Sequence, residues 1–95
     1  GGAPFTTAPN LRSEYAVLEV DERYSPKIRL YNIATGRTGV MKLKKARYQK
    51  QPLAAGDVIR VLNWLRRPAY SYTSGKPEPV PGRQDLWLLE YEVLQ

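Results

Sequence analysis

The side chains best suited to chemistry in this chain are cations and tyrosines, and many of them occur in one stretch. Between Arg23 and Lys50 the sequence contains no acidic residue. The basic residues there are Arg23, Lys27, Arg29, Arg37, Lys42, Lys44, Lys45, Arg47 and Lys50. Such a block favours a polyanion, either a nucleic-acid backbone or an anionic membrane surface. The alternative is a solvated basic surface that only aids solubility.

Other kinds of chemistry lack the residues they need. The chain contains no histidine and no cysteine, which removes the commonest nucleophiles, general bases and metal ligands. Asp21 and Glu22 adjoin a turn and could hold a cation, but neighbouring acids in a turn are more often simply solvated. No glycine-rich phosphate-binding motif is present. We therefore expect no catalytic site, no metal and no cofactor.

The elements that position the basic block are expected to be strands. Alternation of apolar and polar residues, or an excess of β-branched and aromatic residues, predicts strands over 15–21, 27–32, 38–43, 58–65 and 85–94. In the second strand Ile28 and Leu30 face the core, so Lys27, Arg29 and Tyr31 face outward. In the third strand Met41 and Leu43 point inward.

Alternation also assigns the faces of the first and last strands. In the first strand Ala16, Leu18 and Val20 form the apolar set and alternate with Val17, Glu19 and Asp21. In the last strand the residues expected to share a face are Trp87, Leu89, Tyr91 and Val93.

The connections follow from turn residues and helix formers. Residues 34–37 predict a hairpin turn in which Gly36 takes a positive φ. Residues 44–50 are rich in helix formers but end before Pro52, so they predict one or two helical turns at most. Arg66-Arg67-Pro68 is expected to end or bend the fourth strand. The proline- and glycine-rich stretch 69–82 is then a long loop or a hairpin tip.

This order of elements predicts an all-β fold, a five-stranded OB-type Greek-key barrel with one short helix between strands 3 and 4. An SH3-like barrel would not place its helix there. Residues 1–13 are expected to be a flexible linker or a cloning remnant, and residues 14–95 the OB-fold domain. We expect no signal peptide and no membrane span, and the absence of cysteine favours a cytoplasmic protein.

In OB-folds, oligonucleotides cross the face of the second and third strands, between the loop that joins the first two strands and the loop that joins the last two. This predicts a nucleic-acid-binding surface in which cations neutralise phosphates and tyrosine rings stack on unpaired bases. Its candidate residues are Arg23, Tyr24, Lys27, Arg29, Tyr31, Lys42, Lys44, Arg66, Arg67, Tyr70 and Tyr72.

Structural roles compete with these assignments. Tyr31 could instead pair with a cross-strand neighbour, and Tyr70 and Tyr72 could pin the proline-rich loop to the barrel. Trp64 and Trp87 lie in apolar strands, which favours positions in the core or at the barrel rim.

The chain also resembles a known family. The segment from Tyr15 to Asn32 (YAVLEVDERYSPKIRLYN), the segment from Gly56 to Ile59 (GDVI) and the closing Trp87 to Glu92 (WLLEYE) are similar to the C-terminal OB-like domain of bacterial DNA polymerase III alpha subunits. The similarity covers about Tyr15 to Leu94 and includes none of that family's catalytic motifs. It implies a non-catalytic module that contacts single-stranded template DNA.

Two functions from different classes follow. The first is a module of a replication polymerase that binds nucleic acid, single-stranded DNA in particular, beside other domains or subunits of that polymerase. The second is a protein-interaction barrel that docks within a replication assembly or another multiprotein assembly. Neither involves a membrane or a metal.

Overall fold

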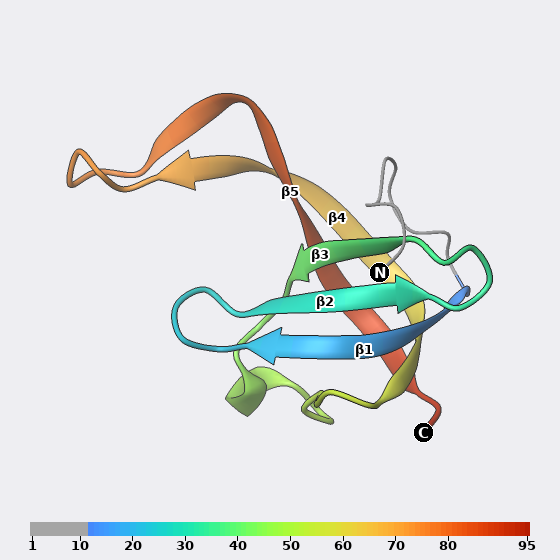
Figure 1. The fold of residues 1–95 in the computed structure, drawn as a ribbon. Coiled ribbons are helices and arrows are strands. Elements are labelled where there is room, and N and C mark those ends of the chain that lie inside the picture. Colours follow the sequence, from blue (N-terminus) through green and yellow to red (C-terminus); the bar gives the residue numbers. More distant parts are fainter. Residues whose placement is uncertain (1–11) are drawn as a thin grey trace.

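The computed structural model describes residues 12–95, and they form one closed β-barrel (Figure 1). Its elements are β1 (Glu14–Asp21), β2 (Lys27–Asn32), β3 (Thr38–Lys42), the 3₁₀ helix η1 (Ala46–Tyr48), β4 (Val58–Ser71) and β5 (Glu78–Val93). The predicted linker lies outside the described residues except for its last two. Of these, Arg12 donates its backbone N–H to the Val61 carbonyl oxygen at 2.8 Å.

The strand order around the barrel is β1-β2-β3-β5-β4, and β4 pairs with β1 to close it. All neighbours are antiparallel except β3 and β5, which meet in parallel at Lys42 and Trp87. The single helical turn lies between β3 and β4. The predicted five-stranded OB-type barrel is therefore confirmed, as is the short helix between strands 3 and 4.

The core lies inside the barrel and is apolar. Its fully buried side chains include Ile28 and Leu30 from β2 and Ile59 and Val61 from β4. Met41 and Leu43, at the end of β3 and just beyond it, are buried as expected. Because the inward residues of β2 are buried, Lys27 and Arg29 are exposed on its outer face.

The expected apolar face of the first strand is wrong in part and holds only at Val20. Tyr15 and Val17 are buried, whereas Leu18 is 45% exposed. A bulge between Val17 and Glu19 shifts the register against β2, so Val20 returns to the core side beyond it. Alternation alone could not reveal the extra residue.

The fourth and fifth strands run much further than expected. β4 does not end at Pro68 but continues to Ser71, and β5 begins at Glu78, so the stretch 69–82 is a hairpin rather than a loop. Figure 1 shows this hairpin leaving the barrel as an arm. Pro68 is tolerated because the register shifts beside it: Pro68 pairs with Gln84 and Tyr70 with Pro79.

The predicted face of the last strand is wrong in part. The shift between Asn63 and its neighbours changes which β5 residues point inward. Leu86 and Leu88 contact the core together with Tyr91 and Val93. Trp87 therefore lies on the outer face, and Leu89 is 38% exposed.

The turn after β2 is built on Asn32, which is buried. Its Oδ1 accepts the backbone N–H groups of Ala34 and Thr35, and its Nδ2 donates to the Tyr15 hydroxyl. Gly36 takes the expected positive φ of +73°. Across residues 12–95 the structure contains no helix long and apolar enough to span a bilayer.

Candidate nucleic-acid interface

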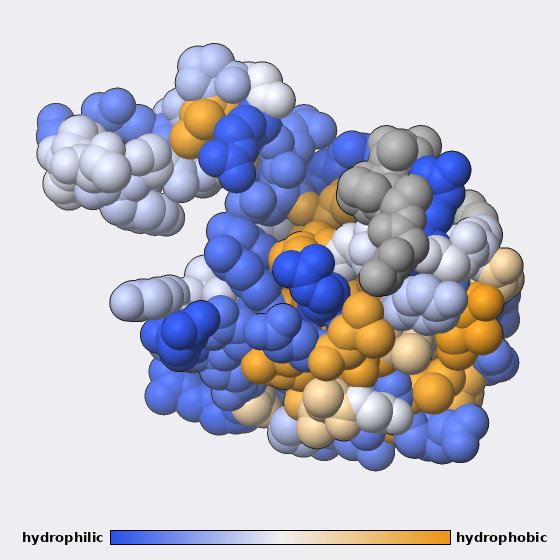
Figure 2. Space-filling model, in the orientation of Figure 1, coloured by the Kyte–Doolittle hydropathy of each residue, from blue (hydrophilic) through white to orange (hydrophobic). Residues whose placement is uncertain are grey.

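A cleft of about 370 Å³ separates the outer face of β2 and β3 from the root of the arm. In Figure 2 the arm stands apart from the barrel body, and mostly hydrophilic side chains border the hollow between them. The residues that line the cleft are Lys27, Val40, Lys42, Ala69, Tyr70, Val80, Arg83, Gln84, Asp85 and Leu86. Three cations thus face one carboxylate, which suits a negatively charged ligand.

The floor of the cleft is set by strand register. Lys27 at the start of β2 pairs with Lys42 at the end of β3. Side chains opposite one another on one face of an antiparallel pair lie about 5 Å apart at Cβ. Two lysines are therefore adjacent at this edge of the barrel, where a phosphate could contact both.

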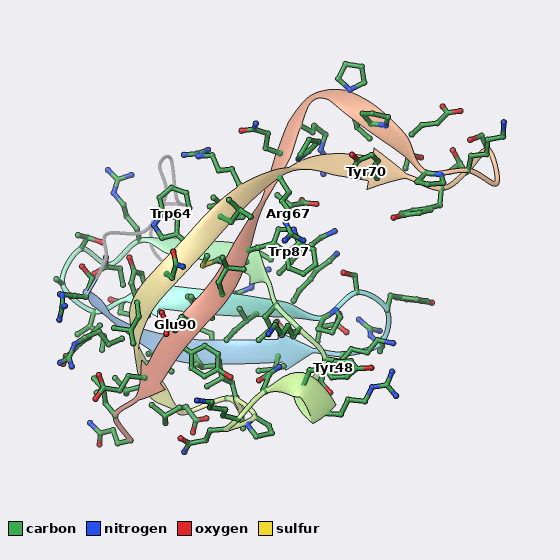
Figure 3. The ribbon with its side chains drawn as sticks, turned by 180° about the vertical axis from the view of Figure 1, so that it is seen from behind. Tyr48, Trp64, Arg67, Tyr70, Trp87 and Glu90 are labelled. Carbon is green, nitrogen blue, oxygen red and sulfur yellow. The ribbon has the colours of Figure 1, made fainter. Side chains whose placement is uncertain are left out.

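Lys42 also contacts β5. Its Nζ lies 3.0 Å from Asp85 Oδ2 and 6.0 Å from the centroid of the Trp87 ring. The guanidinium of Arg67 lies 5.2 Å from the same ring, and Figure 3 shows Arg67 and Trp87 together at the root of the arm. Trp87 thus holds two cations close together through cation–π contacts.

The arm supplies the opposite wall. Residues 80–83 of β5 face only Ala69 of β4, since Gln84 pairs with Pro68 and Pro79 with Tyr70. This wide bulge, with Gly82 at a φ of +73°, turns Val80 and Arg83 toward the cleft. Tyr70 is 48% exposed and lines the cleft, while Tyr72 is 68% exposed nearer the tip. The wall therefore offers an aromatic ring beside a cation.

The β1–β2 loop leads into Lys27, the first residue of β2, but none of its own residues lines the cleft. Tyr24 is 88% exposed in this loop. Arg23 is held by Asp21: its Nε lies 3.1 Å from Oδ1 and its Nη2 3.0 Å from Oδ2. These hydrogen bonds lower the pKa of Asp21 from 3.8 to about 2. The loop therefore presents an exposed ring and a cation whose charge is largely neutralised.

We expect an NMR pH titration to find Asp21 with a pKa of about 2 and Arg23→Gln to return it toward 3.8. Because the folded pKa is lowered, this pair stabilises the fold above about pH 3.8, and its contribution is lost as the pH falls toward 2. A normal Asp21 pKa in the parent protein would show that the pair does not persist in solution.

Some candidate residues lie outside the cleft. Arg29 is exposed in a neighbouring hollow, 3.9 Å from Glu19, and Tyr31 is half-buried at the far end of β2. Lys44 borders a different groove beyond η1. Arg66 lies 5.7 Å from the Trp64 ring, and Figure 3 shows Trp64 well apart from Trp87. Trp64 packs against the core, as expected.

The sequence reasoning missed Arg83, Asp85 and Trp87 as members of this surface. Strict alternation places Trp87 on the same face of the last strand as Leu89, Tyr91 and Val93, but the register shift in β5 interrupts that alternation. Arg83 follows a run of prolines and Gly82, and this composition predicted a loop instead of a strand that forms a wall of the cleft. The available signal was a basic residue two positions before the expected start of the last strand at Asp85.

The described part of the chain places no three acidic side chains together as a metal site. Comparison with protein-family models, curated proteins and solved structures returned no match for this chain.

Proposed function

We propose that this barrel binds single-stranded nucleic acid, single-stranded DNA in particular, in the cleft between the β2–β3 face and the β4–β5 arm. The observation that carries the proposal is the convergence of Lys27, Lys42, Arg83 and Tyr70, from four strands, on one cleft. Cations beside an exposed aromatic ring are the combination that single-stranded nucleic acid requires.

The chemistry divides between the two walls. Lys27 and Lys42 neutralise backbone phosphates at the floor, and Arg83 neutralises them from the arm. An unpaired base stacks on Tyr70, whose ring is half-exposed at the cleft. A base in a duplex offers no free face to such a ring, so single strands are preferred over double strands. Tyr24 extends the surface on the loop side.

The wider assignment rests on the resemblance. We propose that the barrel is a binding module of a cytoplasmic replication polymerase, beside other domains or subunits that carry the catalysis. Its contribution is to hold the template strand, and it supplies no catalytic group, metal or cofactor. A protein-docking barrel is the function that would remain if no nucleic acid bound.

The test is a fluorescence-anisotropy titration with labelled oligo(dT), oligo(rU) and duplex DNA at several salt concentrations. We expect oligo(dT) to bind more tightly than duplex. The slope of log affinity against log salt should be about −2, because three cations each contribute roughly −0.7 for a single strand. Absence of oligo(dT) binding at low salt would reject the proposal, and a flat salt response would reject the role of the cations.

Removing the carboxylate in the cleft should strengthen binding. Asp85 holds Lys42 at 3.0 Å and would repel an approaching phosphate. We expect Asp85→Asn to raise oligo(dT) affinity by up to about fivefold, since a partly exposed ion pair is worth roughly 0.2–1 kcal/mol. The measurement is the same titration at fixed low salt.

Glu90→Gln is the matched control, because it removes the same charge from the same strand. Glu90 does not line the cleft, and Figure 3 shows it further along β5 from the arm than Trp87. Equal gains in Asp85→Asn and Glu90→Gln would mean that total charge, rather than this cleft, governs binding.

A further inference from the structure

The seam between β3 and β5 is open along most of β5. The two strands pair only at Lys42 and Trp87. The chain then leaves β5, and the Leu43 backbone N–H donates to the Pro26 carbonyl oxygen at 3.3 Å. From residue 88 to 93, β5 pairs with β4 on one side, and no strand within residues 12–95 pairs with its other side. Such an edge presents unpaired backbone N–H and C=O groups.

A groove of about 580 Å³ follows this edge. One wall is β5 from Leu88 to Val93, and the other is the segment around η1, which contributes Tyr48. Figure 3 shows the labelled side chains Tyr48 and Glu90 on these two elements. Leu43 and Leu88 are buried beneath the groove, and Leu89 is exposed at its margin. The groove therefore combines an open strand edge with an apolar base.

The far wall is held in place. The Tyr91 hydroxyl lies 2.9 Å from both Gln49 Oε1 and the Gln51 carbonyl oxygen, and donates its proton to one of them at a time. Gln49 Nε2 in turn donates to the Lys44 carbonyl oxygen at 2.6 Å. Partial burial raises the pKa of Tyr91, so the hydroxyl stays protonated at neutral pH. A ligand would enter a groove that is already formed, which lowers the entropic cost of binding.

The charges along the β5 edge are also informative. Glu92 is paired with Arg60 at 3.2 Å. Glu90 is exposed, and no cation of residues 12–95 lies within ion-pair distance of it. A strand added beside β5 would run about 4.8 Å away and bring its outward side chains next to Glu90.

We propose that the open edge of β5 accepts an extended segment of a partner protein as an added strand. Apolar side chains of the segment point toward Leu43 and Leu88, and a lysine or arginine pairs with Glu90. Main-chain hydrogen bonds supply affinity and the alternating side chains supply specificity, as in other cases of strand addition. This interface is separate from the nucleic-acid cleft and does not depend on it.

Two other occupants fit less well. In a two-fold pairing of two β5 edges, Glu90 and Glu92 of both copies would share one face, and like charges across strands are destabilising. A nucleic acid would place phosphates against the same carboxylates on β5, although Lys44 and Lys50 line the opposite wall. A partner segment with a cation avoids both conflicts.

The experiment follows amide chemical shifts of the isotope-labelled chain during titration with the capped peptide Thr-Val-Lys-Val-Thr-Val. We expect shifts confined to residues 88–93 and 43–51, with none in the cleft. The same peptide N-methylated at alternate residues should not bind, because it lacks the N–H donors that a strand requires. Equal binding of the N-methylated peptide, or no shift at millimolar peptide, would overturn the proposal.

Charge exchange gives the sharper readout. Glu90→Lys should weaken binding of the lysine peptide about two- to tenfold and strengthen binding of its Lys→Glu counterpart by a similar factor. Glu78→Lys, an equal change on the exposed arm, should do neither. If oligo(dT) changed the amide chemical shifts of the groove residues, nucleic acid would replace the partner segment as the occupant. If sedimentation showed a dimer that Glu90→Lys altered, the occupant would be a second copy of the chain. If the peptide bound the groove but oligo(dT) did not bind the cleft, the proposed function would be rejected and this inference would stand.

Discussion

Leu30→Ala is expected to lower the free energy of unfolding by about 2–5 kcal/mol. Leu30 lies in the middle of β2 and is 0% exposed, within a core formed by residues from all five strands. The substitution leaves a cavity that the barrel cannot easily collapse around, because β2 is paired on both sides, with β1 and with β3. Urea denaturation followed by tryptophan fluorescence gives the measurement, since Trp64 packs against the core.

Leu18→Ala is the matched control, with the same side-chain change in the neighbouring strand. Leu18 is 45% exposed, so its loss should cost no more than about 0.5 kcal/mol. If both variants lost similar stability, the bulge in β1 would be misplaced and Leu18 would be a core residue. If neither did, the barrel interior would not be the main source of stability.

Tyr70→Ala is expected to cost about 1–3 kcal/mol of oligo(dT) affinity, the range found when a ring that stacks on a base is removed. The salt slope should stay the same, because no phosphate contact is lost. Tyr70 lies on the arm at the cleft, and Figure 3 shows it beyond the Arg67–Trp87 pair. Anisotropy titrations over a range of salt measure affinity and slope together.

Tyr48→Ala serves as the control, because Tyr48 is 63% exposed but lies on η1, outside the cleft. It should leave oligo(dT) affinity unchanged. The competing role for Tyr70 is to pin the arm to the barrel. A loss of thermal stability in Tyr70→Ala with unchanged affinity would establish that role and remove stacking from the proposed function.

Much of the barrel could be predicted from local pattern. Alternation in residues 27–32 determined both the strand and its faces, because apolar Ile28 and Leu30 alternate with more polar residues. Gly36 marked the hairpin turn, and Pro52 limited the helix to η1. These features depend on a few neighbouring residues, so the sequence alone was sufficient to identify them.

The residues of the candidate site were also predictable only in part. Lys27, Lys42 and Tyr70 were predicted as ligand contacts and line one cleft: alternation places the two lysines on the outer face of β2 and β3, and Tyr70 was expected from the connection between the last two strands. Tyr31 was predicted with them but lies at the other end of β2. Which end of a strand meets the arm depends on how β5 crosses the barrel, and local pattern does not contain that information.

What the sequence by itself determined is the class of fold, the order of its strands and the basic character of the β2–β3 face. Only the tertiary structure decided the bulges, the arm and the open edge of β5. The register shift beside Asn63 puts Trp87 outside, next to Lys42 and Arg67, and the wide bulge beside Ala69 brings Arg83 to the cleft. Register is set by pairing between strands that are distant in sequence, so one extra residue in one strand changes the faces of all that follow.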